Sequence, residues 1–160
     1  MRSMQMMKNG RDLSIEQSAA KDAGRTETFV KLRRSLLTSA AWTMMSVNCF
    51  RLMNFLMAEH LSKGGKENGN LRATYDQLVE RGIPRRLVHR TIDEAEALGL
   101  IRAVRGGRRG FTNHMTDYTI TYLPCRRGNY WADPTDDWIS ILPAQIAEFQ
   151  KLRKMKTKKL

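Results

Sequence analysis

The sequence has little cysteine, and its 160 residues contain no long apolar run. Its two cysteines, Cys49 and Cys125, are far apart and show no metal-ligand spacing. We therefore expect no disulfide framework and a reducing, cytoplasmic setting. No apolar stretch approaches the ~20 residues of a membrane span. The first 14 residues lack a continuous apolar segment, so the sequence predicts neither a secretory signal nor a membrane partner.

Acidic residues are scarce relative to basic ones. The chain has 28 Lys+Arg against 16 Asp+Glu, a net charge of +12. This balance favours a polyanionic partner such as nucleic acid, which would place the protein at the nucleoid. The alternative that composition leaves open is a basic protein with no such partner.

Catalytic motifs are missing as well. The three histidines (His60, His89 and His114) are widely separated, and the sequence has no HExxH, P-loop, GxSxG or paired-cysteine pattern. We therefore predict that the protein is not an enzyme, with no catalytic residue, no metal site and no cofactor.

The composition divides the chain into three parts. Residues 1–28 are polar, carry mixed charge and have no sustained periodicity, which predicts a flexible arm. Residues 29–124 have the apolar periodicity of a folded domain. Residues 125–160 form a C-terminal extension with an amphipathic helix and a basic tail.

Apolar spacing and caps predict helices at the start of the domain. Leu32 and Leu36 are four residues apart, and Ser39 opens a further turn that brings Ala41 and Trp42 to the core. Ser46 is a good N-cap for a long helix. The core stripe that we expect on this helix recurs at spacings of three and four and comprises Phe50, Met53, Met57 and Leu61.

The next segment has a helix-turn-helix pattern. The glycine-rich stretch 63–70 ends the long helix, and residues 71–73 suit a single short strand. Thr74 and Gln77 form a capping box that opens a brief helix ending at Gly82. Pro84 suits the first position of a second helix, which ends at Gly99. Two helices joined by so tight a turn are typical of this motif.

A hairpin is expected after the second helix. Residues 101–105 and 118–123 read as strands, the second of which alternates Tyr118, Ile120 and Tyr122 with threonines. The intervening GGRRG reads as a loop. The predicted fold is mainly α with a small β-hairpin (α+β): a winged helix-turn-helix with an N-terminal arm and a C-terminal helical extension.

Four basic residues at the start of the second helix are the candidate DNA-reading group. They face away from the core positions predicted for that helix, which are Val88, Ile92, Ala95 and the nearby Leu98. The acids of the helix (Asp93, Glu94 and Glu96) come later. The first residues of such a helix meet base edges in the major groove. The alternative is a solvated surface with ordinary i,i+4 pairs such as Arg90–Glu94. The candidates are Arg85, Arg86, His89 and Arg90.

The hairpin supplies a second candidate group. Glycines let its tip approach a DNA backbone closely, and arginine is favoured in narrow minor grooves. A solvated turn is the alternative. The candidates are Arg102, Arg105, Arg108 and Arg109.

The C-terminal extension carries weaker signals. Thr135 is expected to cap one turn that holds Trp138, and a helix is predicted from Pro143 because Ile146, Phe149 and Leu152 fall three residues apart. That helix either packs on the domain or pairs with a second copy in a homodimer.

We expect core or lid positions for Trp42, Trp131 and Trp138. The basic tail either contacts phosphates non-specifically or aids solubility, and comprises Lys151, Arg153, Lys154, Lys156, Lys158 and Lys159.

Several stretches resemble a known family. FVKLRRSLLTSAAW, SVNCFRLMNFLMAEH, GNLRATYDQLVERGIPRRLVHRTIDEAEALGLI and YTITYLP resemble bacterial winged helix-turn-helix DNA-binding proteins over residues 29–124. The chain looks similar to regulators of α-proteobacterial chromosomes and mobile elements, and more distantly to the N-terminal domains of phage and plasmid replication proteins. The resemblance implies double-stranded DNA binding through residues 85–90 and the hairpin.

These features leave three functional hypotheses. The leading one is a sequence-specific bacterial transcriptional regulator. A second is an accessory DNA-binding protein of replication initiation or of a mobile element, which an origin-proximal binding site would favour. A third is a protein-interaction or RNA-binding module, which a preference for RNA in competition would favour.

Overall fold

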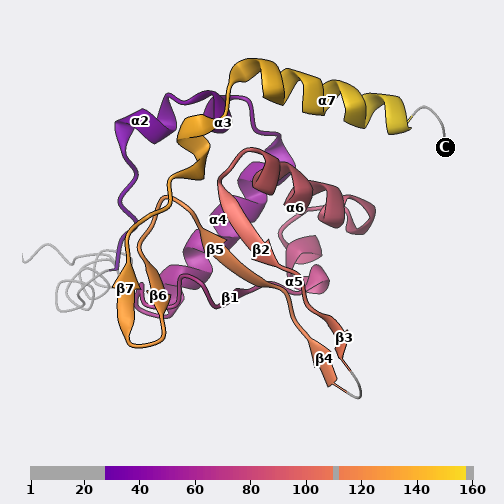
Figure 1. Ribbon diagram of the computed structural model, residues 1–160. Coiled ribbons are helices and arrows are strands. Elements are labelled where there is room, and N and C mark those ends of the chain that lie inside the picture. The colour runs from indigo at the N-terminus through magenta and orange to yellow at the C-terminus, as the bar shows by residue number, and fades with distance from the viewer. Residues whose placement is uncertain (1–27, 110–111, 158–160) are drawn as a thin grey trace, which may run out of the picture.

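The computed structural model describes residues 28–109 and 112–157, with side chains omitted at 107–114 and 152–157. The chain has a mixed α+β fold in which helices pack against a three-stranded antiparallel sheet, and a hairpin extends from that sheet (Figure 1). The expected arm at 1–28 lies outside the described residues, apart from Thr28. None of the helices in the described ranges is long and apolar enough to cross a membrane.

Three helices open the fold, and serine caps set two of their starts. Helix α2 (Arg34–Leu37) buries Leu36 completely. Helix α3 (Ala40–Thr43) and helix α4 (Val47–Ser62) begin after Ser39 and Ser46, whose hydroxyls accept a backbone N–H three residues on. Both predicted caps are confirmed.

The expected core stripe of α4 is largely wrong. Phe50 is 45% exposed, and Met57 and Leu61 are half-buried, so only Met53 of the four is fully buried. A second set of residues on α4, each one position earlier, has the same spacing of three and four. This set lies on a different face, because each residue turns a helix by about 100°. The buried residues are Cys49, Leu52, Met53, Phe55, Leu56 and His60.

The predicted helix-turn pattern is present, with one correction. Strand β1 (Leu71–Arg72) leads to helix α5 (Tyr75–Glu80), which starts with the expected capping box of Thr74 and Gln77. Pro84 was expected at the first helical position, but its ψ of 132° keeps it outside the helix. The second helix instead starts as one 3₁₀ turn, η1 (Arg85–Leu87), and continues as α6 (Val88–Ala97).

Both helices of this pair end in the same hydrogen-bonded turn. After α5, Gly82 has a φ of +83° and the N–H of Ile83 reaches back to the carbonyl of Leu78. After α6, Gly99 has a φ of +64° and Leu100 donates to Ala95 in the same way. This is the Schellman motif, in which glycine adopts the left-handed conformation at little cost.

The sheet has the order β1-β5-β2, all antiparallel. Strand β2 (Ile101–Val104) pairs with β5 (Asp117–Ile120), which is shorter than the predicted 118–123. The predicted inward residues Tyr118, Ile120 and Tyr122 are buried. GGRRG was expected to be a loop, but β3 (Gly107–Arg109) pairs with β4 (Thr112–His114), so part of it is strand.

A second hairpin, absent from the sequence-based prediction, follows the sheet. Strands β6 (Cys125–Arg127) and β7 (Tyr130–Ala132) form it. Buried Asn68 fixes its start, because its side-chain amide donates to the carbonyls of Ile120, Leu123 and Pro124 at 2.9–3.1 Å. A residue expected only to break a helix therefore joins the turn after α4 to the end of the sheet.

The chain ends in one 3₁₀ turn and a long helix. The turn η2 (Asp137–Ser140) buries Trp138, but the residue before it is Asp136 in the left-handed conformation, and the expected cap Thr135 lies one position earlier. Helix α7 (Pro143–Thr157) begins as predicted and buries Ile146. Trp42 is half-buried, whereas Trp131 is 51% exposed, which contradicts its expected core or lid position.

Candidate nucleic-acid interface

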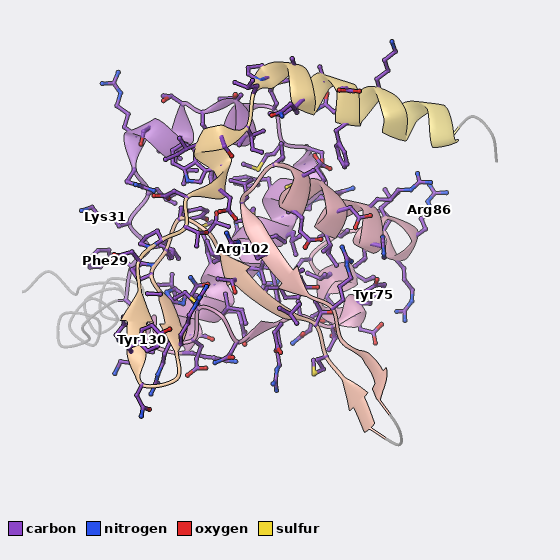
Figure 2. The ribbon with its side chains drawn as sticks, in the orientation of Figure 1. Phe29, Lys31, Tyr75, Arg86, Arg102 and Tyr130 are labelled. Atoms are coloured by element: carbon purple, nitrogen blue, oxygen red, sulfur yellow. The ribbon has the colours of Figure 1, made fainter. Side chains whose placement is uncertain are left out.

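The four basic candidates of the second helix share one surface, which we call the α6 entrance (residues 85–90). Arg85, Arg86 and His89 are exposed, and Arg90 is half-buried. Figure 2 shows Arg86 pointing away from the body of the molecule. The opposite face of the helix packs on the core through Val88, Ile92, Ala95 and Leu98, as the sequence predicts.

The three acids of α6 are all engaged by other parts of the protein. Glu94, which the alternative of a solvated surface would pair with Arg90, is only 3% exposed. Its carboxylate accepts hydrogen bonds from the backbone N–H and the hydroxyl of Ser46 at 2.8 and 2.9 Å. The negative charge of Glu94 is therefore used at the N-terminus of α4, where the helix dipole favours it.

Asp93 and Glu96 engage a basic residue at the base of the hairpin. Arg105 lies between them, 2.8 Å from a carboxylate oxygen of Asp93 and in contact with Glu96. Asp93 also accepts from Nδ1 of His89 at 2.9 Å. The two acids thus connect the hairpin to α6, and Arg105 is held by them.

Two arginines of the α6 entrance differ in their partners. Arg85 forms an ion pair with Asp76 of α5, which links the two helices of the pair. Arg86 forms no hydrogen bond or ion pair within the described part of the chain. Judged by the contacts among the described residues, its guanidinium is the one at this entrance that an incoming anion meets without breaking an intramolecular contact.

Arg102 lies apart from the other hairpin candidates. Its guanidinium binds the carboxylate of Asp137 in η2 through two hydrogen bonds of 2.7 and 2.8 Å. These bonds raise the pKa of Arg102 and lower the pKa of Asp137. Arg102 thus joins the sheet to the C-terminal extension, and the structure does not bring it to the hairpin.

The hairpin and the α6 entrance lie on the same side of the molecule. Strands β3 and β4 extend from the lower right of the fold in Figure 1, below α6. Arg108 and Arg109 are on β3, opposite Asn113 and Thr112, and their side chains lie outside the described part. In the basic tail, Lys151 is exposed, residues 153–156 are described as helix backbone only, and Lys158 and Lys159 are outside the described ranges.

The β6–β7 hairpin was missed by sequence reasoning, although it adds four exposed basic and aromatic side chains. Arg126 and Arg127 lie opposite Trp131 and Tyr130. Its loop, Gly128–Asn129, has glycine with a φ of +60°, and a Gly-Asn pair between short runs is a known hairpin signal. That dipeptide could have predicted it.

Comparison of the chain with protein-family models, curated proteins and solved structures found no match.

Proposed function

We propose that this chain is a double-stranded DNA-binding protein of the winged helix-turn-helix kind. In this proposal α5 and α6 form the helix-turn-helix, the α6 entrance lies in the major groove, and the β3–β4 hairpin is the wing. The order of elements supports it, because α4, β1, α5, α6 and β2 are followed by a hairpin and a return strand β5 that completes the sheet.

One observation carries the proposal: the three acids of α6 are all bound to groups of the protein itself. Glu94 is buried against α4, while Asp93 and Glu96 are paired with Arg105. A helix that enters the major groove must present cations and few anions to phosphate, because phosphate contacts supply most of the electrostatic affinity. Among the arginines of the α6 entrance, Arg86 is then the one whose guanidinium has no partner in the described part of the chain.

The proposed roles follow from these contacts. Arg86 is the first candidate for a bidentate contact to guanine or a contact to phosphate. Arg85, His89 and Arg90 contact neighbouring bases or phosphates, with Arg85 exchanging Asp76 for DNA. Arg108 and Arg109 contact phosphate or the minor groove. The biological use we favour is transcriptional regulation; bound sites clustered at a replication origin would favour the replication role instead.

The test is fluorescence anisotropy with genomic duplex fragments at several salt concentrations. We expect Arg86→Ala to reduce the discrimination between the best fragment and random duplex by about 1–3 kcal/mol. The matched control is Lys31→Ala, which removes one exposed positive charge from the opposite side of the molecule (Figure 2). The double variant Arg108→Ala, Arg109→Ala should mainly reduce the salt dependence. Equal loss in the Arg86 and Lys31 variants would exclude the α6 entrance as the reading surface.

A further inference from the structure

A hollow of about 190 Å³ lies between the three-stranded sheet and the β6–β7 hairpin. In Figure 1 this hairpin and the β3–β4 hairpin are on opposite sides of the fold, so the hollow is separate from the proposed duplex-binding surface. Small-molecule sites usually span ~300–1,000 Å³, so a hollow of this size suits a chemical group of a few heavy atoms.

The sheet contributes a guanidinium and a hydroxyl to the hollow. Arg102 of β2 pairs with Thr119 of β5, so their side chains lie on one face of the sheet. It is the outer face, because the alternating residues Tyr118 and Ile120 are buried in the core. The Thr119 hydroxyl has no partner within the described residues. Arg102 donates through Nε and Nη2 to Asp137, which leaves the N–H groups of Nη1 available in that part of the chain.

The hairpin brings a second guanidinium to the same hollow. Cys125 and Arg127 are two residues apart on β6 and therefore share one face of the hairpin. That face is turned toward the sheet, because a Cβ added to Gly69 would lie 2.8 Å from Sγ of Cys125 and 4.0 Å from Oγ1 of Thr119. Arg127 lines the hollow and has no hydrogen bond or ion pair in the described part of the chain. Its guanidinium is therefore free to bind a ligand.

The charge around the hollow is positive. Among the described residues that line it, Arg102, Arg126 and Arg127 stand against one acid, Asp133. Asp137, outside this lining, offsets the charge of Arg102. The guanidiniums and the hydroxyl present donors from two sides, which suits the oxygens of a tetrahedral anion, because arginine binds phosphate through paired N–H groups. An uncharged occupant would leave these donors without a charged acceptor.

We propose that this hollow binds a phosphate group, with its oxygens held by the guanidinium of Arg127, Nη1 of Arg102 and the hydroxyl of Thr119. The group is either inorganic phosphate or the phosphate of a small phosphomonoester. Bound there, it connects the sheet to the β6–β7 hairpin beside the Arg102–Asp137 pair. The site goes beyond duplex binding and does not depend on it.

The test is a titration with sodium phosphate at constant ionic strength, followed through the nuclear magnetic resonance signal of the Gly69 backbone amide, which lies in the lining. We expect a saturable shift. Arg127→Ala should weaken binding about tenfold, the effect of losing one charge-assisted hydrogen bond. Thr119→Val, which removes the hydroxyl and changes no charge, should weaken it about threefold. Asp133→Asn should tighten binding about threefold, because it removes the lining acid.

The charge-matched control is Arg34→Ala. Arg34 is exposed on α2, outside the lining, and its guanidinium has no partner within the described residues. Its replacement should change the affinity less than about twofold. A shift that does not saturate, or equal weakening in the Arg127 and Arg34 variants, would mean that phosphate only screens the overall positive charge, and would overturn the proposal.

Phenyl phosphate identifies the source of the group. Binding at least as tight as that of inorganic phosphate indicates a phosphomonoester, and weaker binding indicates the free ion. The duplex proposal is tested apart from this one, because Arg86→Ala should bind phosphate as the wild type does and Arg127→Ala should keep its discrimination between duplexes. Failure of either proposal therefore leaves the other standing.

Discussion

The carboxylate of Glu94 accepts both the backbone N–H and the hydroxyl of Ser46, 48 residues earlier in the chain, at 2.8 and 2.9 Å. The Ser46 hydroxyl in turn accepts from the N–H of Cys49 and so caps α4. One acid thus connects the N-terminus of α4 to the middle of α6. It fixes how the α6 entrance projects from the core, although Glu94 itself faces inward.

Replacing Glu94 should therefore reduce stability. Glu94→Ala removes both bonds and leaves the N–H of Ser46 without an acceptor, which we expect to cost about 2–3 kcal/mol of the free energy of unfolding. Glu94→Gln keeps one oxygen acceptor and should cost about half as much. Urea unfolding followed by circular dichroism measures both. Losses below about 0.5 kcal/mol for the alanine variant would mean that the contact contributes little, as for ordinary surface substitutions.

Replacing Asp93 should instead strengthen the proposed DNA binding. Asp93→Asn weakens the hold on His89 and Arg105 and removes one negative charge beside the entrance. We expect duplex affinity to rise several-fold, with a salt slope steeper by about 1, because one more cation can meet phosphate. Anisotropy at three salt concentrations measures this.

The control for that variant is Glu67→Gln, which makes the same charge change in the turn after α4. It should leave the salt slope unaltered. A similar gain in both variants would show that overall charge, rather than the weaker hold on His89 and Arg105, determines affinity.

The sequence predicted the parts of this fold that depend on contacts between residues close together in the chain. The caps at Ser39, Ser46 and Thr74 and the turn at Gly99 each depend on hydrogen bonds within a few residues, and all are present. The core face of α6 was also predicted, because its apolar residues fit one stripe. On α4 two stripes fit the same spacing, and packing against other elements decided between them.

Contacts between distant residues could not be predicted in this way. Glu94 pairs with Ser46, Arg102 with Asp137 across 35 residues, and Asn68 with Ile120 across 52. Glu94, Arg102 and Asn68 each had a plausible surface or turn role in the sequence. The charge pattern of the candidate interface was readable from spacing, but which of its arginines are held by acids depends on tertiary structure.

Gly99 should tolerate substitution far less than another glycine of similar conformation. Its φ is +64°, and an added Cβ would lie 2.7 Å from the backbone nitrogen of Trp138. Gly99→Ala should therefore cost about 2–4 kcal/mol of unfolding free energy, from left-handed strain together with overpacking. Gly64→Ala is the matched control, since Gly64 has a φ of +67° and nothing within 4 Å of an added Cβ. It should cost about 1 kcal/mol, from backbone strain alone. Equal losses in thermal or urea unfolding would show that η2 moves away from α6 freely.

His60 should make stability dependent on pH. Burial lowers its pKa below the usual value of 6.5, so at mildly acidic pH the unfolded chain binds a proton that the folded chain does not. The free energy of unfolding should consequently be highest above pH ~7 and fall as pH decreases through 6.5, by at most about 1.4 kcal/mol per pH unit. Urea unfolding at pH 7.5, 6.5 and 5.5 measures this. His60→Met, which cannot titrate, should flatten the dependence, whereas His89→Gln at the exposed α6 entrance should leave most of it in place. If the wild type and the His60→Met variant lose stability in parallel, protonation of His60 is not what destabilises the fold in acid.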